Sequence, residues 1–225
     1  MDSDKEKGKD KLSTSVSLID SIEADLGKIG ADVGEVGVDF FLESDLARSI
    51  PIVKILLSGY GLYRSTRDYF FTRKVLSYLS EFTDVPQEKR SAFAAKLSAD
   101  AGTREKAGAA LMLLLDRLDD LEKPVIVGRL YRAHLEGRIS YTDLRRFCMI
   151  VDRAFLPDLV ELSRSRDLER LSRESAEHLH SLGLFAIAGE DLMGWPDGSP
   201  GSKITYALNS LGDRFLSVAL PAESS

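Results

Sequence analysis

The feature that most constrains this fold is a run of apolar residues, spaced alternately three and four apart, between residues 16 and 43. This heptad spacing places all of them on one stripe of an α-helix. Glycines line a second stripe, and each costs roughly 1 kcal/mol relative to alanine inside a helix. Such a helix needs close packing against another. The apolar residues are Ile19, Ile22, Leu26, Ile29, Val33, Val36 and Phe40, and the glycines are Gly27, Gly30, Gly34 and Gly37.

Two uses of a helix over 16–43 stay open. It docks on the protein's own core, or it presents a surface for a partner helix or for self-association. Trp195, in a Gly/Pro-rich loop, is a second candidate anchor because exposed tryptophan often marks an interface; packing against its own hairpin is equally compatible. The expected partner contacts are Ile22, Leu26, Gly27, Gly30, Val33, Gly34, Gly37 and Trp195.

Charge separates the next two segments. Residues 16–43 hold seven acids and one base, whereas residues 54–74 hold five bases and one acid. We therefore predict that the two pack as an acidic–basic helical hairpin, with Pro51 marking a helix start. Aromatic residues interleave with the bases of 54–74, which suits core packing, a membrane surface or single-stranded nucleic acid. The candidate contacts with an anionic surface are Arg64, Arg67, Arg73 and Lys74.

The rest of the chain reads as a series of helices. Residues 1–14 are highly charged and are expected to form a disordered tail. Capping residues and prolines predict later helix starts, and Gly137 predicts a helix end. We predict a mainly α protein: a multi-helix bundle body over 15–165, then a small α+β subdomain over 166–225. The helix-start signals are Asp84 with Pro86, Thr103, Pro124, Ser140 and Pro157.

The C-terminal segment 175–220 runs helix, strand, Gly/Pro-rich loop, strand and a final run, Asn209-Ser210-Leu211-Gly212-Asp213-Arg214-Phe215-Leu216. This order resembles the last helix and wing of a winged-helix domain. The resemblance implies a helix in the major groove and a wing on phosphate, which demands positive charge. The segment has two bases against five acids, a net charge of −3. We therefore expect a module for protein contact or structure, with a DNA-binding regulator as the alternative.

A second resemblance lies in the centre of the chain. Residues 111–158, around Glu136-Gly137-Arg138-Ile139-Ser140, are similar to small bacterial helical domains of the TerB type. The acidic metal-binding cluster of that family has no counterpart at matching places, so no site residue is carried over. The chain otherwise resembles bacterial proteins of unassigned function, and this likeness alone suggests a role accessory to a stress or defence pathway.

Catalytic signatures do not emerge from the sequence. His178 and His180 are two residues apart and point away from each other on a helix. Cys148 lies in an apolar run, which favours a buried thiol. We expect no enzyme activity, no cofactor and no metal, and nucleic acid is disfavoured. Lacking a signal segment or a run of about 20 apolar residues, the chain is expected to be a cytoplasmic, non-catalytic regulatory protein that binds a protein or itself. The other alternative is weak membrane-surface contact through 54–74.

Overall fold

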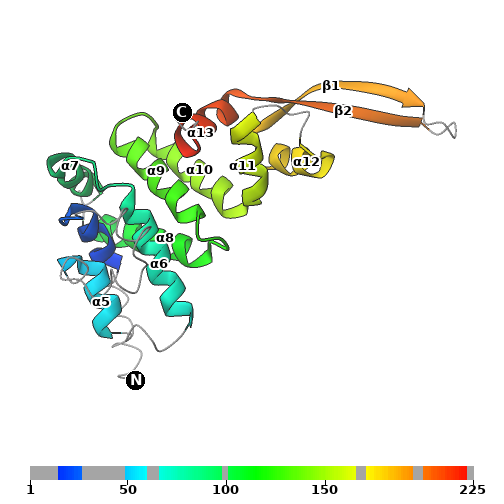
Figure 1. Cartoon of the computed structure of the whole chain (residues 1–225). Helices are drawn as coiled ribbons and strands as arrows, with labels where there is room; N and C mark the ends of the chain where they lie inside the picture. Colours follow the sequence, from blue (N-terminus) through cyan, green and yellow to red (C-terminus); the bar gives the residue numbers. More distant parts are fainter. Residues whose placement is uncertain are drawn as a thin grey trace. The chain divides into compact units, whose positions relative to one another are not determined.

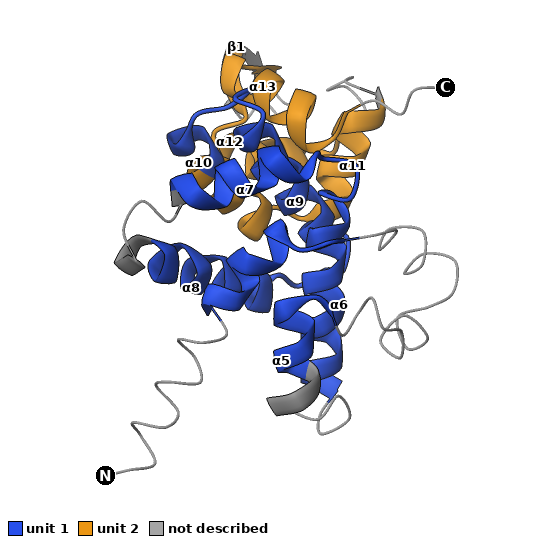
Figure 2. Cartoon of the chain, turned by 90° about the vertical axis from the view of Figure 1, so that its left-hand side faces the viewer, with its two compact units in different colours: residues 1–144 blue, residues 145–225 orange. Residues whose placement is uncertain are grey.

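The computed structural model describes residues 15–26, 49–59, 66–97, 101–165, 171–194 and 200–221. The chain is mainly helical and ends in a two-stranded antiparallel hairpin followed by a helix, which confirms the predicted fold class at this level. It divides into two compact units, residues 1–144 and 145–225, each described by itself below (Figure 2). The division falls inside a helix, upstream of the predicted boundary at 165/166.

The first unit consists of helices whose starts and ends follow local sequence signals. Pro51 opens one helix, and Pro124 lies in the first turn of another, where its missing N–H is not needed. Gly137 ends the latter with a positive φ of 76°. The elements are a helix over residues 15–23, α5 (Pro51–Gly59), α6 (Thr66–Ser80), α7 (Gln87–Leu97), α8 (Ala101–Arg117), α9 (Lys123–Leu135) and the start of α10 (Tyr141–Arg153) (Figure 1).

The packing of α6 on α9 forms a central part of this unit's core. Tyr78 of α6 is fully buried, and its ring lies 5.3 Å from that of Phe82 and 5.5 Å from that of Tyr131. The helices touch where Gly128 faces α6, because a Cβ atom there would lie 2.7 Å from the Tyr78 carbonyl oxygen. A side chain at Gly128 would therefore force the two helices apart.

The segment 15–26 corrects the first sequence prediction. Its helix ends at Glu23 and residues 24–26 are not helical, so one continuous helix over 16–43 is wrong at that point; residues 27–48 lie outside the described part. The carbonyl oxygens of Ile22 and Ala24 instead accept hydrogen bonds from Arg90, at 2.8 and 2.5 Å. In a continuous helix, these oxygens would bond to N–H groups four residues later.

This segment docks on the core of its own unit. Leu18, Ile19, Ile22 and Leu26 are buried, with at most 1% of their surface exposed. Ser21 is also buried, and its hydroxyl oxygen accepts the N–H of Ile52 in the first turn of α5 at 2.8 Å. Since the residue before Pro51 has no polar side chain, Ser21 caps α5 from another helix. The docking alternative therefore holds for residues 15–26.

We predicted that the acidic segment 16–43 and the basic segment 54–74 pair with each other, but the described ion pairs of both segments go to α8. Arg104 of α8 forms ion pairs with Asp20 and, at 3.5 Å, with Glu23. In the basic segment, Arg67 of α6 instead pairs with Asp116 at the end of α8, at 2.6 Å. Thus α8 supplies the opposite charge to both segments: its basic residue meets the acidic helix and its acidic residue meets the basic one.

The second unit comprises the remainder of α10, α11 (Leu156–Ser165), α12 (Arg173–Ser181), β1 (Phe185–Gly194), β2 (Pro200–Leu208) and α13 (Ser210–Ala219). The strands pair antiparallel from Phe185↔Leu208 to Gly194↔Pro200, with a bulge between Ile187 and Gly189. The hairpin extends away from the helices of this unit (Figure 1).

The base of the hairpin is fixed by one asparagine and two glycines. Asn209 accepts the N–H of Gly212 at 2.9 Å as the N-cap of α13 and donates to the Gly183 carbonyl oxygen at 2.9 Å. Gly183 ends the turn after α12 with a positive φ of 83°. The core of this unit includes Phe147 and Phe215, whose rings lie 5.4 Å apart in an edge-to-face arrangement. Local turn chemistry therefore connects α12, the hairpin and α13.

A Gly108→Ala variant tests the docking of residues 15–26. A Cβ at Gly108 of α8 would overlap the carbonyl group of Ser15. We expect the substitution to lower the free energy of unfolding by about 1–3 kcal/mol, as overpacking does. Helix propensity alone predicts the opposite, a gain of up to about 1 kcal/mol. Urea denaturation followed by circular dichroism measures the sign.

The exposed Ala110 on the same helix provides the control for this test. Ala110→Gly should destabilise by roughly 0.5–1 kcal/mol through propensity alone. If Gly108→Ala raised the free energy of unfolding, the close approach of Ser15 to α8 would be refuted.

Candidate functional site

The structure places only part of the predicted partner surface. Ile22 and Leu26 are buried in the first unit, at 0% and 1% exposure, so neither side chain presents a surface to a partner. The other predicted contacts lie outside the described residues. They are Gly27, Gly30, Val33, Gly34, Gly37 and Trp195.

Two of the predicted anion-contacting bases in the described chain are occupied at the end of α8. Lys74 donates from its ammonium group to the carbonyl oxygens of Asp116 and Leu118, at 3.1 and 2.5 Å. Cations are favourable at such a helix C-terminus. Arg67 pairs with Asp116, and Arg73 lies 6.0 Å from the centre of the Tyr69 ring. Lys74 and Arg67 thus serve the first unit itself, and Arg64 lies outside the described residues.

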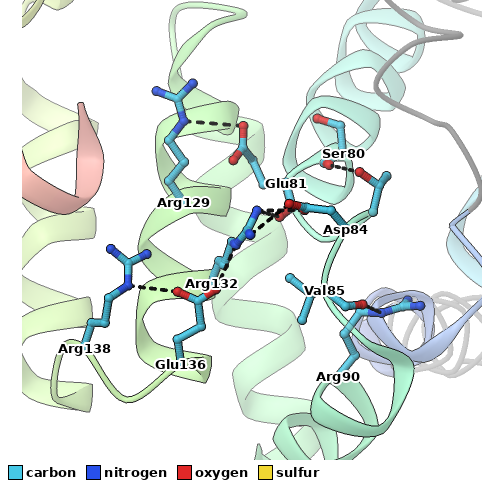
Figure 3. Close-up of polar contacts among 10 residues, drawn as sticks. Ser80, Glu81, Asp84, Val85, Arg90, Arg129, Arg132, Glu136 and Arg138 are labelled. Carbon is cyan, nitrogen blue, oxygen red and sulfur yellow. Dashed lines mark hydrogen bonds and ion pairs between the residues drawn. The ribbon is translucent and has the colours of Figure 1, made fainter. Parts of the chain in front are cut away.

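A cluster of charged residues joins the end of α6 to α9 (Figure 3). Arg132 donates to both carboxylate oxygens of Asp84, at 2.8 and 3.0 Å, and to Glu136 at 3.0 Å. Arg138 pairs with Glu136 at 2.9 Å, and Arg129 lies 3.5 Å from Glu81. Asp84 was predicted to cap α7, but its carboxylate instead accepts hydrogen bonds from Arg132. At the start of α7, the backbone N–H of Arg90 donates to the Pro86 carbonyl oxygen.

The two glutamates of this cluster differ in their environments. Burial raises the pKa of Glu81 above its ordinary value, and the charge of Arg129 offsets only part of this effect. Burial also acts to raise the pKa of Glu136, but the hydrogen bond from Arg132 and the charge of Arg138 together lower it. Both carboxylates pair with arginines, which fits a structural role for this cluster in holding the end of α6 against α9.

The histidines and Cys148 have structural contacts, and the sequence assigned no reactive role to them. His134 and His180 each place Nδ1 2.9 Å from the carbonyl oxygen five residues later, across the turns made by Gly137 and Gly183. Burial, with a smaller effect of Asp152, raises the pKa of the Cys148 thiol to about 12. That thiol is protonated at neutral pH. Among the described residues, no three His, Cys, Asp or Glu side chains could hold a metal ion together.

The outer face of α10 in the second unit is different. Its inner face buries Phe147, Ile150 and Val151, while Met149 is 54% exposed. Phe155, just after the helix, is 62% exposed. The spacing of three and four residues puts the exposed members of α10 on one face. We call the face made by Arg145, Arg146, Met149 and Arg153 the α10 stripe.

The arginines of the α10 stripe form no ion pair with a described acid, although Asp152 lies on the same face of the helix, three residues after Met149. In the described part of the chain, no ion pair joins Arg145, Arg146 or Arg153 to a carboxylate, whereas Arg104 and Arg132 each have two. Sequence reasoning missed this surface. The available signal was Met149, an apolar residue on the face of an amphipathic helix where a charged residue is usual.

Comparison with known proteins found no matching family model, curated protein or solved structure. The winged-helix and TerB-type resemblances therefore stay predictions. No helix in the described ranges is both long enough and apolar enough to cross a lipid bilayer. The α10 stripe is the main candidate contact surface among the described residues.

Two variants of the cluster in Figure 3 should shift stability in opposite directions. A raised carboxyl pKa means that ionisation opposes folding, so Glu81→Gln should stabilise the protein at pH 7. The lowered pKa of Glu136 means that ionisation favours folding, so Glu136→Gln should destabilise it there. We expect each change to be below about 1 kcal/mol, because the pairs are partly exposed.

Chemical denaturation at pH 7 and at pH 3 checks both signs. The advantage of Glu81→Gln should fade as the pH falls to the ordinary glutamate pKa of about 4.3. The cost of Glu136→Gln should fade as the pH falls through its own lowered pKa. If both variants changed the free energy of unfolding at pH 7 in the same direction, the opposite environments assigned to Glu81 and Glu136 would be contradicted.

Proposed function

We propose that this chain is a non-catalytic regulatory protein of a bacterial cytoplasm that acts by binding another protein. The contact surface in the proposal is the α10 stripe. One observation carries it: arginines that form no ion pair with any described acid flank exposed Met149, on a helix whose opposite face is anchored in the core. Arginine, methionine and aromatic residues are the types enriched at protein interfaces.

The second unit offers less to a DNA-binding function. Its α12 and hairpin correspond to the segment that resembles the last helix and wing of a winged-helix domain, and α12 would be the recognition helix. Arg173, the base at the start of α12, pairs with Glu177 at 2.7 Å. Because Glu177 already pairs with this arginine, a contact between Arg173 and a DNA phosphate would add little binding free energy. The shape therefore fits a protein-contact module better.

Site-specific photo-cross-linking tests the proposed function. A benzophenone amino acid at Met149 of the full chain should give a discrete protein adduct in the native host. The adduct mass, read by mass spectrometry, tells a second copy of this chain from a different protein. The yield should fall at least fivefold when Arg145→Glu and Arg146→Glu are added, because the same surface is then repulsive.

The matched control places the same photo-reactive group at Glu174, an exposed position on α12 of the same unit. We expect no discrete adduct there. Equal adduct patterns at both positions, or no protein adduct at Met149, would refute the α10 stripe as a contact surface.

A further inference from the structure

We infer that the α10 stripe binds an acidic, amphipathic helical segment of its partner. The inference rests on the proposed function and adds the chemistry of the partner to it. A groove is not required, since one helix face can receive another through residues spaced three and four apart.

The geometry of the stripe suits a short helical segment. Arg145 and Arg146 lie one turn before Met149, and Arg153 lies one turn after it. The eight rises of 1.5 Å from Arg145 to Arg153 make the stripe about 12 Å long, or roughly two helical turns. Burial of Phe147, Ile150 and Val151 beneath it holds the backbone in place. The surface is therefore preorganised, and binding orders few groups.

The charge of the stripe calls for carboxylates. A guanidinium group is a planar donor that binds a carboxylate through two parallel hydrogen bonds. Elsewhere in the second unit, Arg173 has such an acidic neighbour in Glu177. Arg145, Arg146 and Arg153 have no ion pair with any described acid, so their donors face solvent. Glutamate or aspartate spaced one turn apart on a partner would satisfy them.

The apolar member of the stripe favours a polypeptide over nucleic acid. Met149 is more than half exposed, and burying it requires an apolar partner. Methionine is adaptable and is common at protein-binding surfaces. Residues 145–225 carry nine Lys and Arg against twelve Asp and Glu, a net charge of −3. A nucleic acid would meet that net repulsion, whereas a short acidic helix contacts only the basic stripe.

A lipid surface is also disfavoured. An interfacial helix inserts a broad apolar face into the headgroup region. The apolar face of the second-unit part of α10 is already buried, and Met149 is the large apolar side chain that this part leaves exposed. One methionine flanked by three arginines matches the apolar seam and acidic flanks of one amphipathic helix.

Fluorescence anisotropy with a designed probe tests this inference on the full chain. The probe is a labelled 18-residue peptide with leucine at helical spacing and glutamate elsewhere. We expect a micromolar Kd that weakens at least fivefold between 50 and 300 mM salt, as charge pairing requires. The same peptide with lysine in place of glutamate should bind at least tenfold more weakly.

Variants test whether the peptide probe binds at the α10 stripe. Arg146→Glu with Arg153→Glu should weaken binding at least tenfold, and Met149→Ser should weaken it several-fold. Arg173→Glu, an exposed arginine on α12, is the matched control and should leave the Kd unchanged. Circular dichroism confirms that each variant folds, since all of these side chains are exposed.

Several results would overturn the inference. They are equal binding of the lysine peptide, full binding by the doubly reversed variant, and tighter stripe-dependent binding of a duplex DNA or an anionic vesicle than of the acidic peptide. If cross-linking at Met149 succeeds while the acidic peptide fails, protein binding stands and the acidic partner is refuted. If both fail, the proposed function falls as well.

Discussion

The first unit depends on a buried guanidinium. Arg90 is only 6% exposed, and it donates to the carbonyl oxygens of Val85, Ile22 and Ala24. Two of these oxygens belong to the end of the N-terminal helical segment, where helix carbonyls have no partner of their own. A guanidinium there satisfies them and complements the negative end of the helix dipole. One side chain thus ends a helix and holds it on the core.

The other contacts of that segment agree with this role. Ser21 caps α5, and Arg104 pairs with Asp20 and Glu23. The absence of a side chain at Gly108 lets Ser15 approach α8. Docking of the segment buries Ile22 and Leu26, so neither side chain is exposed to a partner. The α10 stripe of the second unit, by contrast, is exposed and is the contact surface that we propose.

Local signals in the sequence predicted the parts of the fold that depend on neighbouring residues. Pro51, Pro124 and Gly137 gave helix boundaries because each restricts the backbone where it stands. The end of the helix at Glu23 was not predictable in this way, because its cause, Arg90, lies more than sixty residues away. The α10 stripe was missed for a related reason: periodicity shows which face is polar, but not which arginines find an acidic partner.

Hydrogen–deuterium exchange of the native protein and of Arg90→Met measures the central claim most directly. The backbone amides of residues 19–23 should exchange slowly in the native protein. In the variant they should exchange at least tenfold faster, because a charge-assisted hydrogen bond contributes about 1.5–3 kcal/mol. Amides of α6 and α9 should change less. Unprotected amides at 19–23 in the native protein, or equal exchange in both proteins, would contradict the role of Arg90.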